Sequence, residues 1–166
     1  MSSNYTFATL RRATLLGAIA LTLGACATKP MPSNLADSVA KNPTLSTFNS
    51  LITQGSLSET LKSGGPFTVF APTNDAFKAV SAAVMADLTK HPEKLKEVLS
   101  FHITPGKLMA ADIKNSNVKS LQGSNLALAK AGDFVIVESA TVIAADLGAT
   151  NGVVHTIDTV LLPPKK

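Results

Sequence analysis

One stretch in the first half of the chain, GPFTVFAPTNDAFKAV at residues 65–80, restricts the fold more than any other. Its first part, FTVFAP, is rich in aromatic and β-branched residues and predicts a buried strand. Pro72 fixes its own φ and has no N–H for a strand ladder, so the strand must end nearby. Thr73 can accept a hydrogen bond from a backbone N–H in the next turn, which caps a helix that directs Phe77 inward. The stretch therefore predicts a buried strand followed at once by a helix.

The polar residues of this junction have both a structural and a catalytic interpretation. Asp75 lies near the N-terminus of the predicted helix, where the helix dipole favours a negative charge by ~0.3–1 kcal/mol. As a general acid or base, Asp75 would need a second titrating group, and the neighbouring sequence offers none. We therefore interpret Thr73-Asn74-Asp75 as a capping junction. Serine-nucleophile and phosphate-loop signatures are also absent from the sequence, so we predict no catalytic residue and no cofactor.

Helical and strand patterns are unevenly distributed along the chain. From residue 35 to about residue 103, apolar residues recur mostly at helical spacing, apart from the FTVFAP strand. After that point the chain changes to short runs such as FVIV and TVIAAD, which are separated by Gly, Asn and Asp. Near the end, ATNG predicts a hairpin turn and VVHTIDTVLL a strand buried on much of both faces. A helix-rich first half and a strand-rich second half predict an α+β domain.

The first 25 residues have the features of an export signal. Arg11 and Arg12 form a positive start, and the apolar run ATLLGAIALTLGA that follows is shorter than the ~20 residues that span a bilayer. The run ends in LGAC, where small residues precede the only cysteine, Cys26. This resembles a bacterial lipobox and implies that cleavage leaves a diacylated Cys26 on a short tether, residues 26–34. Ordinary secretory cleavage, with Cys26 as a free thiol, is the alternative.

The charge pattern argues against nucleic acid as a partner. The net charge of +4 includes the only arginines, which lie in the leader, so no guanidinium remains in the domain for bidentate phosphate contacts. The lysines are scattered along the chain. Aromatic residues make up 5% and Trp is absent, which leaves few stacking surfaces for single strands or sugars.

Three segments resemble the signature segments of fasciclin-like domains. They are GPFTVFAPTNDAF, then LSFHITPGKL, with Phe101 where the family has tyrosine, and finally NGVVHTIDTVLLP. Their order and spacing agree with the family, and the resemblance covers residues 35–164. It implies an α+β fold in which a twisted β-wedge or sandwich packs against several helices. It also implies a secreted or lipid-anchored protein associated with cell adhesion or the extracellular matrix.

The same resemblance indicates a candidate partner-binding surface. Phe101 and His102 occupy the central segment, which is linked to adhesion in animal members, and Asp112-Ile113 matches an Asp-Ile adhesion element of animal relatives. We predict that these four residues contact a protein or a matrix or cell-surface component. At Phe101 any contact that used the tyrosine hydroxyl is lost. The alternative for Asp112-Ile113 is a loop aspartate followed by a core isoleucine.

The histidines leave one further question open. His102 and His155 both lie in signature segments, and a two-histidine metal site is one interpretation. Without a nearby Cys or carboxylate pattern this signal is weak, so we predict no metal and expect partly buried rings bonded to backbone or hydroxyl groups.

The expected function is a non-catalytic adhesion or interaction module outside the cytoplasm. It would be a membrane-anchored lipoprotein held by Cys26, periplasmic or at the cell surface, and in the outer membrane if the host is Gram-negative. A periplasmic protein that binds an apolar small molecule or a metal is the alternative.

Overall fold

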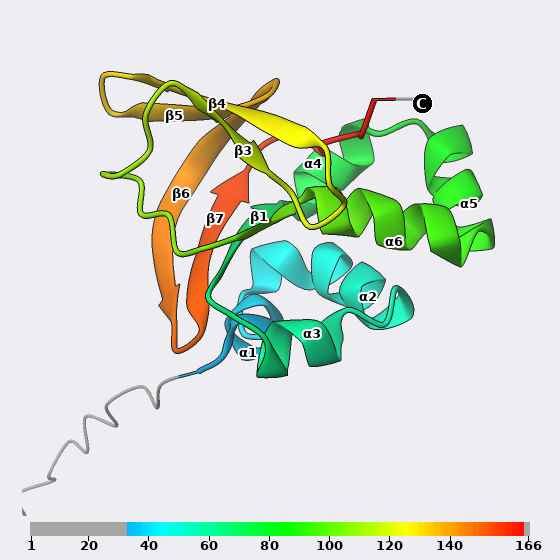
Figure 1. Cartoon of the computed structure of the whole chain (residues 1–166). Coiled ribbons are helices and arrows are strands. Elements are labelled where there is room, and N and C mark those ends of the chain that lie inside the picture. Colours follow the sequence, from blue (N-terminus) through cyan, green and yellow to red (C-terminus); the bar gives the residue numbers. More distant parts are fainter. Residues whose placement is uncertain (1–32, 165–166) are drawn as a thin grey trace, which may run out of the picture.

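The computed structural model describes residues 33–164; the leader, Cys26 and most of the tether lie outside them. The helices are α1 (Leu35–Ala40), the 3-10 helix η1 (Pro43–Leu45), α2 (Ser46–Gln54), α3 (Ser58–Ser63), α4 (Asn74–Ala79), α5 (Ala82–Lys90) and α6 (Pro92–Phe101). The strands are β1 (Phe67–Pro72), β2 (Ile103–Pro105), β3 (Ser116–Lys119), β4 (Asn125–Ala131), β5 (Phe134–Val137), β6 (Ala140–Ala149) and β7 (Gly152–Ile157). The helix-rich first half and the strand-rich second half confirm the predicted α+β class (Figure 1).

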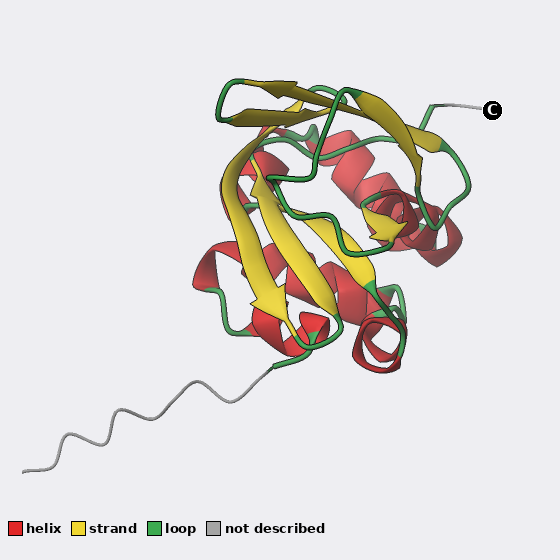
Figure 2. Cartoon of the chain, turned by 60° about the vertical axis from the view of Figure 1, so that its left-hand side comes forward, coloured by secondary structure: helices red, strands yellow, loops and turns green. Residues whose placement is uncertain are grey.

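The strands form one sheet in the order β2-β1-β7-β6-β5-β4-β3. Its centre is the parallel pair of β1 and β7, in which Phe67 lies opposite Gly152 and Pro72 opposite Ile157. The other neighbouring strands are antiparallel. Parallel neighbours need a long crossover connection, and here everything from α4 to β6 lies between the two strands in the chain. The sheet twists so strongly that β3, β4 and β5 lie across the end of the long strands (Figures 1 and 2).

Two apolar cores lie on opposite faces of the central strands. Val69 and Val154 belong to the core formed with the helices, whereas Phe70 and Ile157 belong to the core formed with β4 and β5. Neighbouring residues of a strand point to opposite faces, so β1 and β7 are covered on both sides. All residues of β7 are buried, which confirms the prediction of a strand buried on both faces.

The strand-to-helix junction has the predicted structure. β1 ends at Pro72, and the hydroxyl of Thr73 accepts a hydrogen bond from the N–H of Ala76 at 3.1 Å. Phe77, one residue further, is buried in the helical core. The cap therefore fixes where α4 begins and which side chain it turns inward.

The end of the chain differs from the expected long strand. β7 ends at Ile157, and the residues after it form an extended tail without a strand partner. This tail still buries Val160 and Leu161 against the two cores, so apolar burial without strand pairing explains the apolar pattern there. Among the described residues, none of the helices has the length and apolarity needed to cross a membrane.

Candidate functional site

Residues 106–114 form a strap between β2 and β3 that crosses the sheet (Figure 2). Thr68, on β1, fixes its start: the hydroxyl donates to the carbonyl oxygen of Gly106 at 2.7 Å and accepts from the N–H of Leu108 at 2.9 Å. The ammonium group of Lys130, on β4, donates to two carbonyl oxygens further along the strap at 2.9 and 3.3 Å. The strap is therefore held at its start and in its middle by side chains from the sheet.

His155 joins the strap to β6 and β7. Its ring stacks on Phe70 with the ring centroids 5.6 Å apart. Nδ1 accepts a hydrogen bond from the N–H of Asp146 at 3.2 Å, so the neutral ring carries its proton on Nε2, which donates to the carbonyl of Leu108 at 2.8 Å. Asp146 in turn accepts from the N–H of Ala110 at 2.8 Å. Burial lowers the pKa of His155, which favours this neutral form.

His102 has a similar role beneath the C-terminal tail. Its side chain is buried, with Nδ1 donating to the carbonyl of Val98 at 2.8 Å and Nε2 accepting from the N–H of Leu161 at 3.0 Å. Burial lowers the pKa of His102 to about 4, against the opposing effect of the Val98 bond. The ring also packs against Phe48 in the helical core, whereas His155 packs against the opposite core. The two histidines thus hold two different segments, each through backbone groups, as expected.

Three of the four candidate partner-binding residues lie inside the protein. Phe101, His102 and Ile113 are 2%, 1% and 2% exposed, whereas Asp112 is exposed. Phe101 and Ile113 pack in the core between the strap and the sheet, where burial of large apolar side chains is favourable. The prediction that these three side chains contact a partner is therefore wrong. They are buried beneath the strap and the C-terminal tail. Of the four, Asp112 alone can face a partner, and Asp112-Ile113 is a loop aspartate followed by a core isoleucine.

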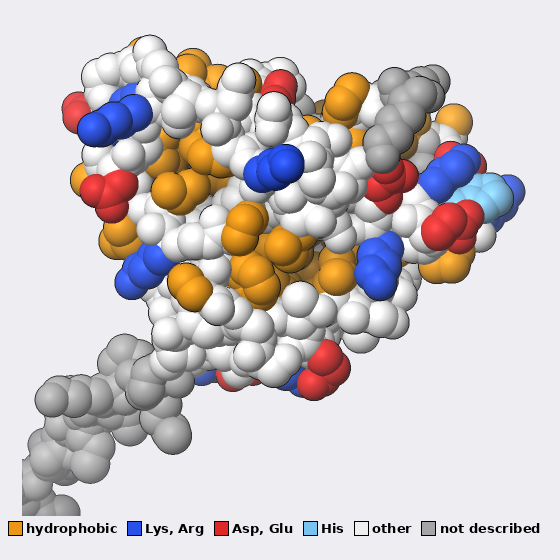
Figure 3. Space-filling model, in the orientation of Figure 1, with side chains coloured by type: hydrophobic (Ala, Val, Ile, Leu, Met, Phe, Trp, Pro, Cys, Tyr) orange, Lys and Arg blue, Asp and Glu red, His pale blue; other side chains and the backbone are white. Residues whose placement is uncertain are grey.

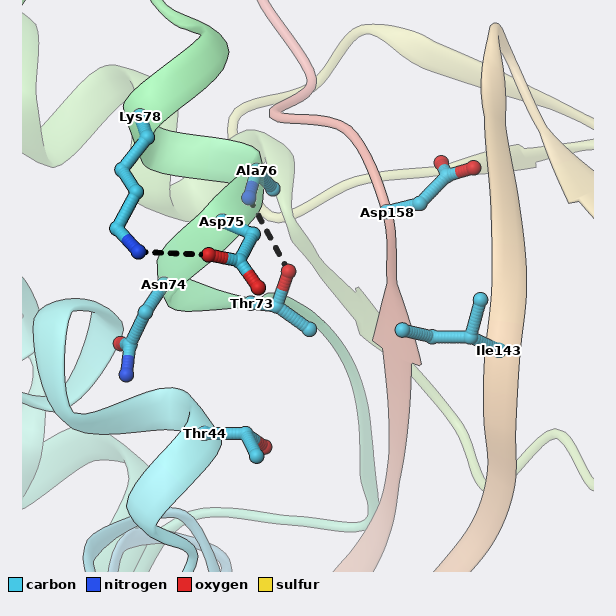
Figure 4. Close-up of a pocket in the computed structure, with 8 residues that line it drawn as sticks. All are labelled: Thr44, Thr73, Asn74, Asp75, Ala76, Lys78, Ile143 and Asp158. Carbon is cyan, nitrogen blue, oxygen red and sulfur yellow. Dashed lines mark hydrogen bonds and ion pairs between the residues drawn. The ribbon is translucent and has the colours of Figure 1, made fainter.

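The junction Thr73-Asn74-Asp75 lines an open groove of about 650 Å³ between α4, η1, β6 and the end of β7 (Figure 4). Asp75 accepts a hydrogen bond from the ammonium group of Lys78 at 2.8 Å. Across the groove, Asp158 accepts from a backbone N–H of β6 at 2.8 Å. Each carboxylate is thus bonded within its own wall of the groove, which favours the capping interpretation over an acid–base pair. Ile143, which is 59% exposed, adds an apolar side chain to the lining of the groove.

Asn74, in the same junction, has a role that its local sequence does not predict. Its Oδ1 accepts from the N–H of Thr47 at 3.0 Å, and its Nδ2 donates to the carbonyl of Pro43 at 3.0 Å. It therefore caps α2 from a different helix. The available signal was Leu45, the residue before α2, because a leucine cannot cap its own helix.

The face crossed by the strap carries an exposed apolar area. Leu108, Met109 and Ala110 of the strap are half-buried. Figure 3 shows hydrophobic side chains along the middle of this face, with Lys, Asp and Glu side chains set apart around them. Apolar areas rimmed by polar residues are typical of interaction surfaces.

Comparison with known proteins identifies the family. The fasciclin domain profile matches residues 43–163, so the chain belongs to the fasciclin domain family. "Protein sll1483" of Synechocystis is 45% identical over 127 residues, 75% of this chain and 71% of that protein. The cell surface glycolipoprotein MPT83 of Mycobacterium tuberculosis is 34% identical over 135 residues, 78% of this chain and 60% of that protein. A solved FAS1 domain pair from the insect cell adhesion molecule fasciclin I superposes with a TM-score of 0.63 at 16% identity, covering 79% of this chain and 51% of that one.

These similarities confirm the predicted family and the fold. At 16% identity, the likeness to fasciclin I concerns the fold alone. Fasciclin domains are non-enzymatic modules of adhesion-related proteins, and relatives such as MPT83 are cell-surface proteins. The chain is therefore an interaction module, and proteins similar to it include one named as a cell surface protein.

Proposed function

We propose that this protein is exported, held on a membrane through a lipidated Cys26, and binds a protein or matrix component through its fasciclin domain. The observation that carries the proposal is what the histidines and acidic residues of the signature segments bind. They bond the strap, the tail and the junction rather than converging on a substrate site. Similarity to a protein named as a cell surface glycolipoprotein supports the anchored location.

The tether would decide how the domain faces the membrane. Residues 26–34 can span at most roughly 30 Å when extended, and the acyl chains of a lipidated cysteine hold a protein on a bilayer with ~0.8 kcal/mol per buried CH₂. The chain enters the domain beside the β6–β7 turn, where the N–H of Thr150 donates to the carbonyl of Ser33 at 2.9 Å (Figure 1). That end would face the membrane, and many anchored copies would make weak individual contacts effective.

The anchor is tested with Cys26→Ser. We expect the substituted protein to move from the membrane pellet to the soluble fraction, because the acyl chains that bind the bilayer are no longer attached. Thr28→Ser, two residues away, serves as the matched control and should stay in the pellet. A Cys26→Ser protein that still sediments with membranes, or a wild-type N-terminus without lipid by mass spectrometry, would contradict the anchor.

The partner contact is tested by crosslinking in intact cells that carry the anchored protein. Asp112→Ala removes an exposed carboxylate from the strap, and Asp133→Ala removes another exposed carboxylate from the β4–β5 turn. We expect a crosslinked partner to weaken in the first variant and persist in the second. The same set of partners in both variants would remove Asp112 from the contact surface.

Small-molecule binding is the weaker candidate. A separate groove of about 610 Å³ lies between α5, α6 and the C-terminal tail. Its apolar walls include Val84, Leu88 and Leu162. Its volume is typical of a ligand site, but such sites usually enclose most of the ligand. Leu162, in its wall, is 51% exposed, so the groove would leave an apolar ligand largely in water.

A further inference from the structure

The outer side of β6 is a free sheet edge. β7 pairs along one side of β6, but on the other side β5 pairs only with Ala140 and Thr141. Within residues 33–164, no strand pairs with residues 142–149 on that outer side, and Figure 2 shows this edge beside no other strand. A free edge presents unpaired N–H and C=O groups, which an additional strand can satisfy.

Two grooves follow this edge on the side of the helices. The groove of about 650 Å³ is lined by Ile143 and Thr44, and a second groove of about 370 Å³ is lined by Leu147 and Pro43. η1 contributes to both, so the two grooves lie near each other between β6 and the helices, and we refer to them together as the trough. Ile143 and Leu147 are 59% and 36% exposed, so each section offers an apolar contact.

The register of the sheet explains why Leu147 points into this trough. Leu147 lies opposite Val154 of β7, and Val154 packs in the helical core. Cross-strand neighbours share a face of the sheet, so Leu147 points to the helical side. On β6 the strap is bound at Asp146, through the hydrogen bond from Ala110, and no strap residue lines either groove.

The trough also has a charge pattern. Asp75 and Asp158 line the section that contains Ile143, and Lys41 lines the section that contains Leu147. Lys78 is paired with Asp75, which leaves the charge of Asp158 without a cationic partner in this section. A basic side chain is therefore favoured near Asp158 and an acidic side chain near Lys41.

We propose that an extended segment of a partner protein adds as a strand to the outer edge of β6. This inference rests on the proposed function and adds a contact site on β6 to the one tested at Asp112. The unpaired backbone edge selects a polypeptide, because backbone hydrogen bonds would supply the affinity. The two grooves would receive apolar side chains on one face of the added strand, and Asp158 would select a basic residue at one end.

Two synthetic peptides test the proposal on the full-length chain in detergent micelles. The probe has nine residues, Lys-Thr-Val-Thr-Val-Thr-Val-Thr-Glu, so that Lys, Val and Glu share one face of the added strand. Its control carries N-methyl groups on alternate residues. Amide hydrogen exchange should show slower exchange at residues 142–149 with the probe. Loss of donors in the N-methylated control should weaken binding by about tenfold or more. Equal binding of both peptides, or slower exchange confined to other residues, would overturn strand addition.

Matched variants locate the contact. Ile143→Lys places a charge in the trough and should abolish peptide binding, whereas Phe134→Lys changes a side chain that is 67% exposed on β5 and should leave binding intact. Far-ultraviolet circular dichroism confirms that both variants are folded. A dimer of the peptide-free chain that Ile143→Lys dissociates would identify a second copy as the occupant and overturn the partner-segment proposal.

The crosslinking experiment separates this inference from the proposed function. Crosslinking that still captures a partner through Asp112, with residues 142–149 unprotected by the probe, would overturn the β6 site and leave the interaction module intact. Probe binding at β6 without any crosslinked partner in cells would instead support the site and contradict the proposed cellular function.

Discussion

Asn151 illustrates how much of this fold depends on single polar side chains. It lies in the β6–β7 turn, where its Oδ1 accepts from the N–H of Leu35 at 2.9 Å, and so it joins the start of α1 to the sheet. Its Nδ2 donates to the carbonyls of Leu61 and Gly64, both at 2.7 Å, at the end of α3. The sequence predicts Asn151 as a turn residue, but its side chain also connects two helices that are distant in the chain.

Asn151→Ala should lower the free energy of unfolding by about 3 kcal/mol, because three hydrogen bonds are lost at roughly 1 kcal/mol each. Asn151→Asp keeps the acceptor for Leu35 but sets a carboxylate oxygen against the two carbonyl oxygens, so we expect a loss at least as large. Asn117→Ala, at an exposed position on β3, is the control and should change stability by less than about 0.5 kcal/mol. Urea unfolding measures all three, and equal values for Asn151→Ala and Asn117→Ala would contradict the role.

His102 makes the stability of the domain depend on pH. Its pKa is about 4 in the folded protein, below the ordinary value of 6.5, so the unfolded chain takes up the proton first as the pH falls. The stability that the neutral ring contributes is complete above pH 6.5 and is lost as the pH falls to about 4. We expect the free energy of unfolding to fall by about 3 kcal/mol over this window, measured by urea unfolding at several pH values.

The control for this pH dependence is the exposed histidine, His91. His102→Gln should flatten the dependence because the group that titrates is gone, while the lowered pKa of His155 leaves a smaller slope of the same sign. His91→Gln should keep the wild-type slope. A wild-type stability that does not change between pH 6.5 and 4 would contradict the buried neutral ring.

At the scale of elements, the strap is an irregular segment that hydrogen bonds hold in place. Thr68→Val keeps the side-chain volume but removes the hydroxyl that bonds Gly106 and Leu108. We expect a loss of about 1–3 kcal/mol from the unpaired groups and faster amide exchange within the strap than in β1 and β7. Hydrogen exchange with mass spectrometry measures this difference.

The neighbouring strand offers a matched control. Thr156, on β7, is buried, and its hydroxyl has no hydrogen-bond partner among the described residues. Thr156→Val should therefore leave stability unchanged or raise it by about 1 kcal/mol, since an unpaired buried hydroxyl is unfavourable. If the two valine variants lose the same stability, hydroxyl bonding does not hold the strap.

The elements themselves could be predicted because their causes are local. Apolar spacing, Pro72 and the Thr73 cap determine β1 and α4 within a few residues of sequence. The burial of Phe101 and His102 could not be predicted in this way. They lie at the end of α6, and the strap and the tail that cover them come from later parts of the chain.

At the scale of the whole molecule, family and fold follow from the sequence, whereas the trough beside β6 does not. Ile143 and Leu147 belong to an apolar run that predicts an ordinary strand. One edge of this strand is free because β5 separates from β6 after Thr141. This separation is a property of the assembled sheet, not of the local sequence.

The parallel pair of β1 and β7 also has a consequence for how the protein is made. Gly152 approaches Phe67 so closely that a Cβ there would overlap the Phe67 carbonyl oxygen, and this contact joins the middle of the chain to its end. While the chain is still being translated, β1 has no β7 to pair with, and the two cores cannot close. For the export that we propose, a sheet completed only after β7 leaves the ribosome would keep the chain open for threading through a secretion channel.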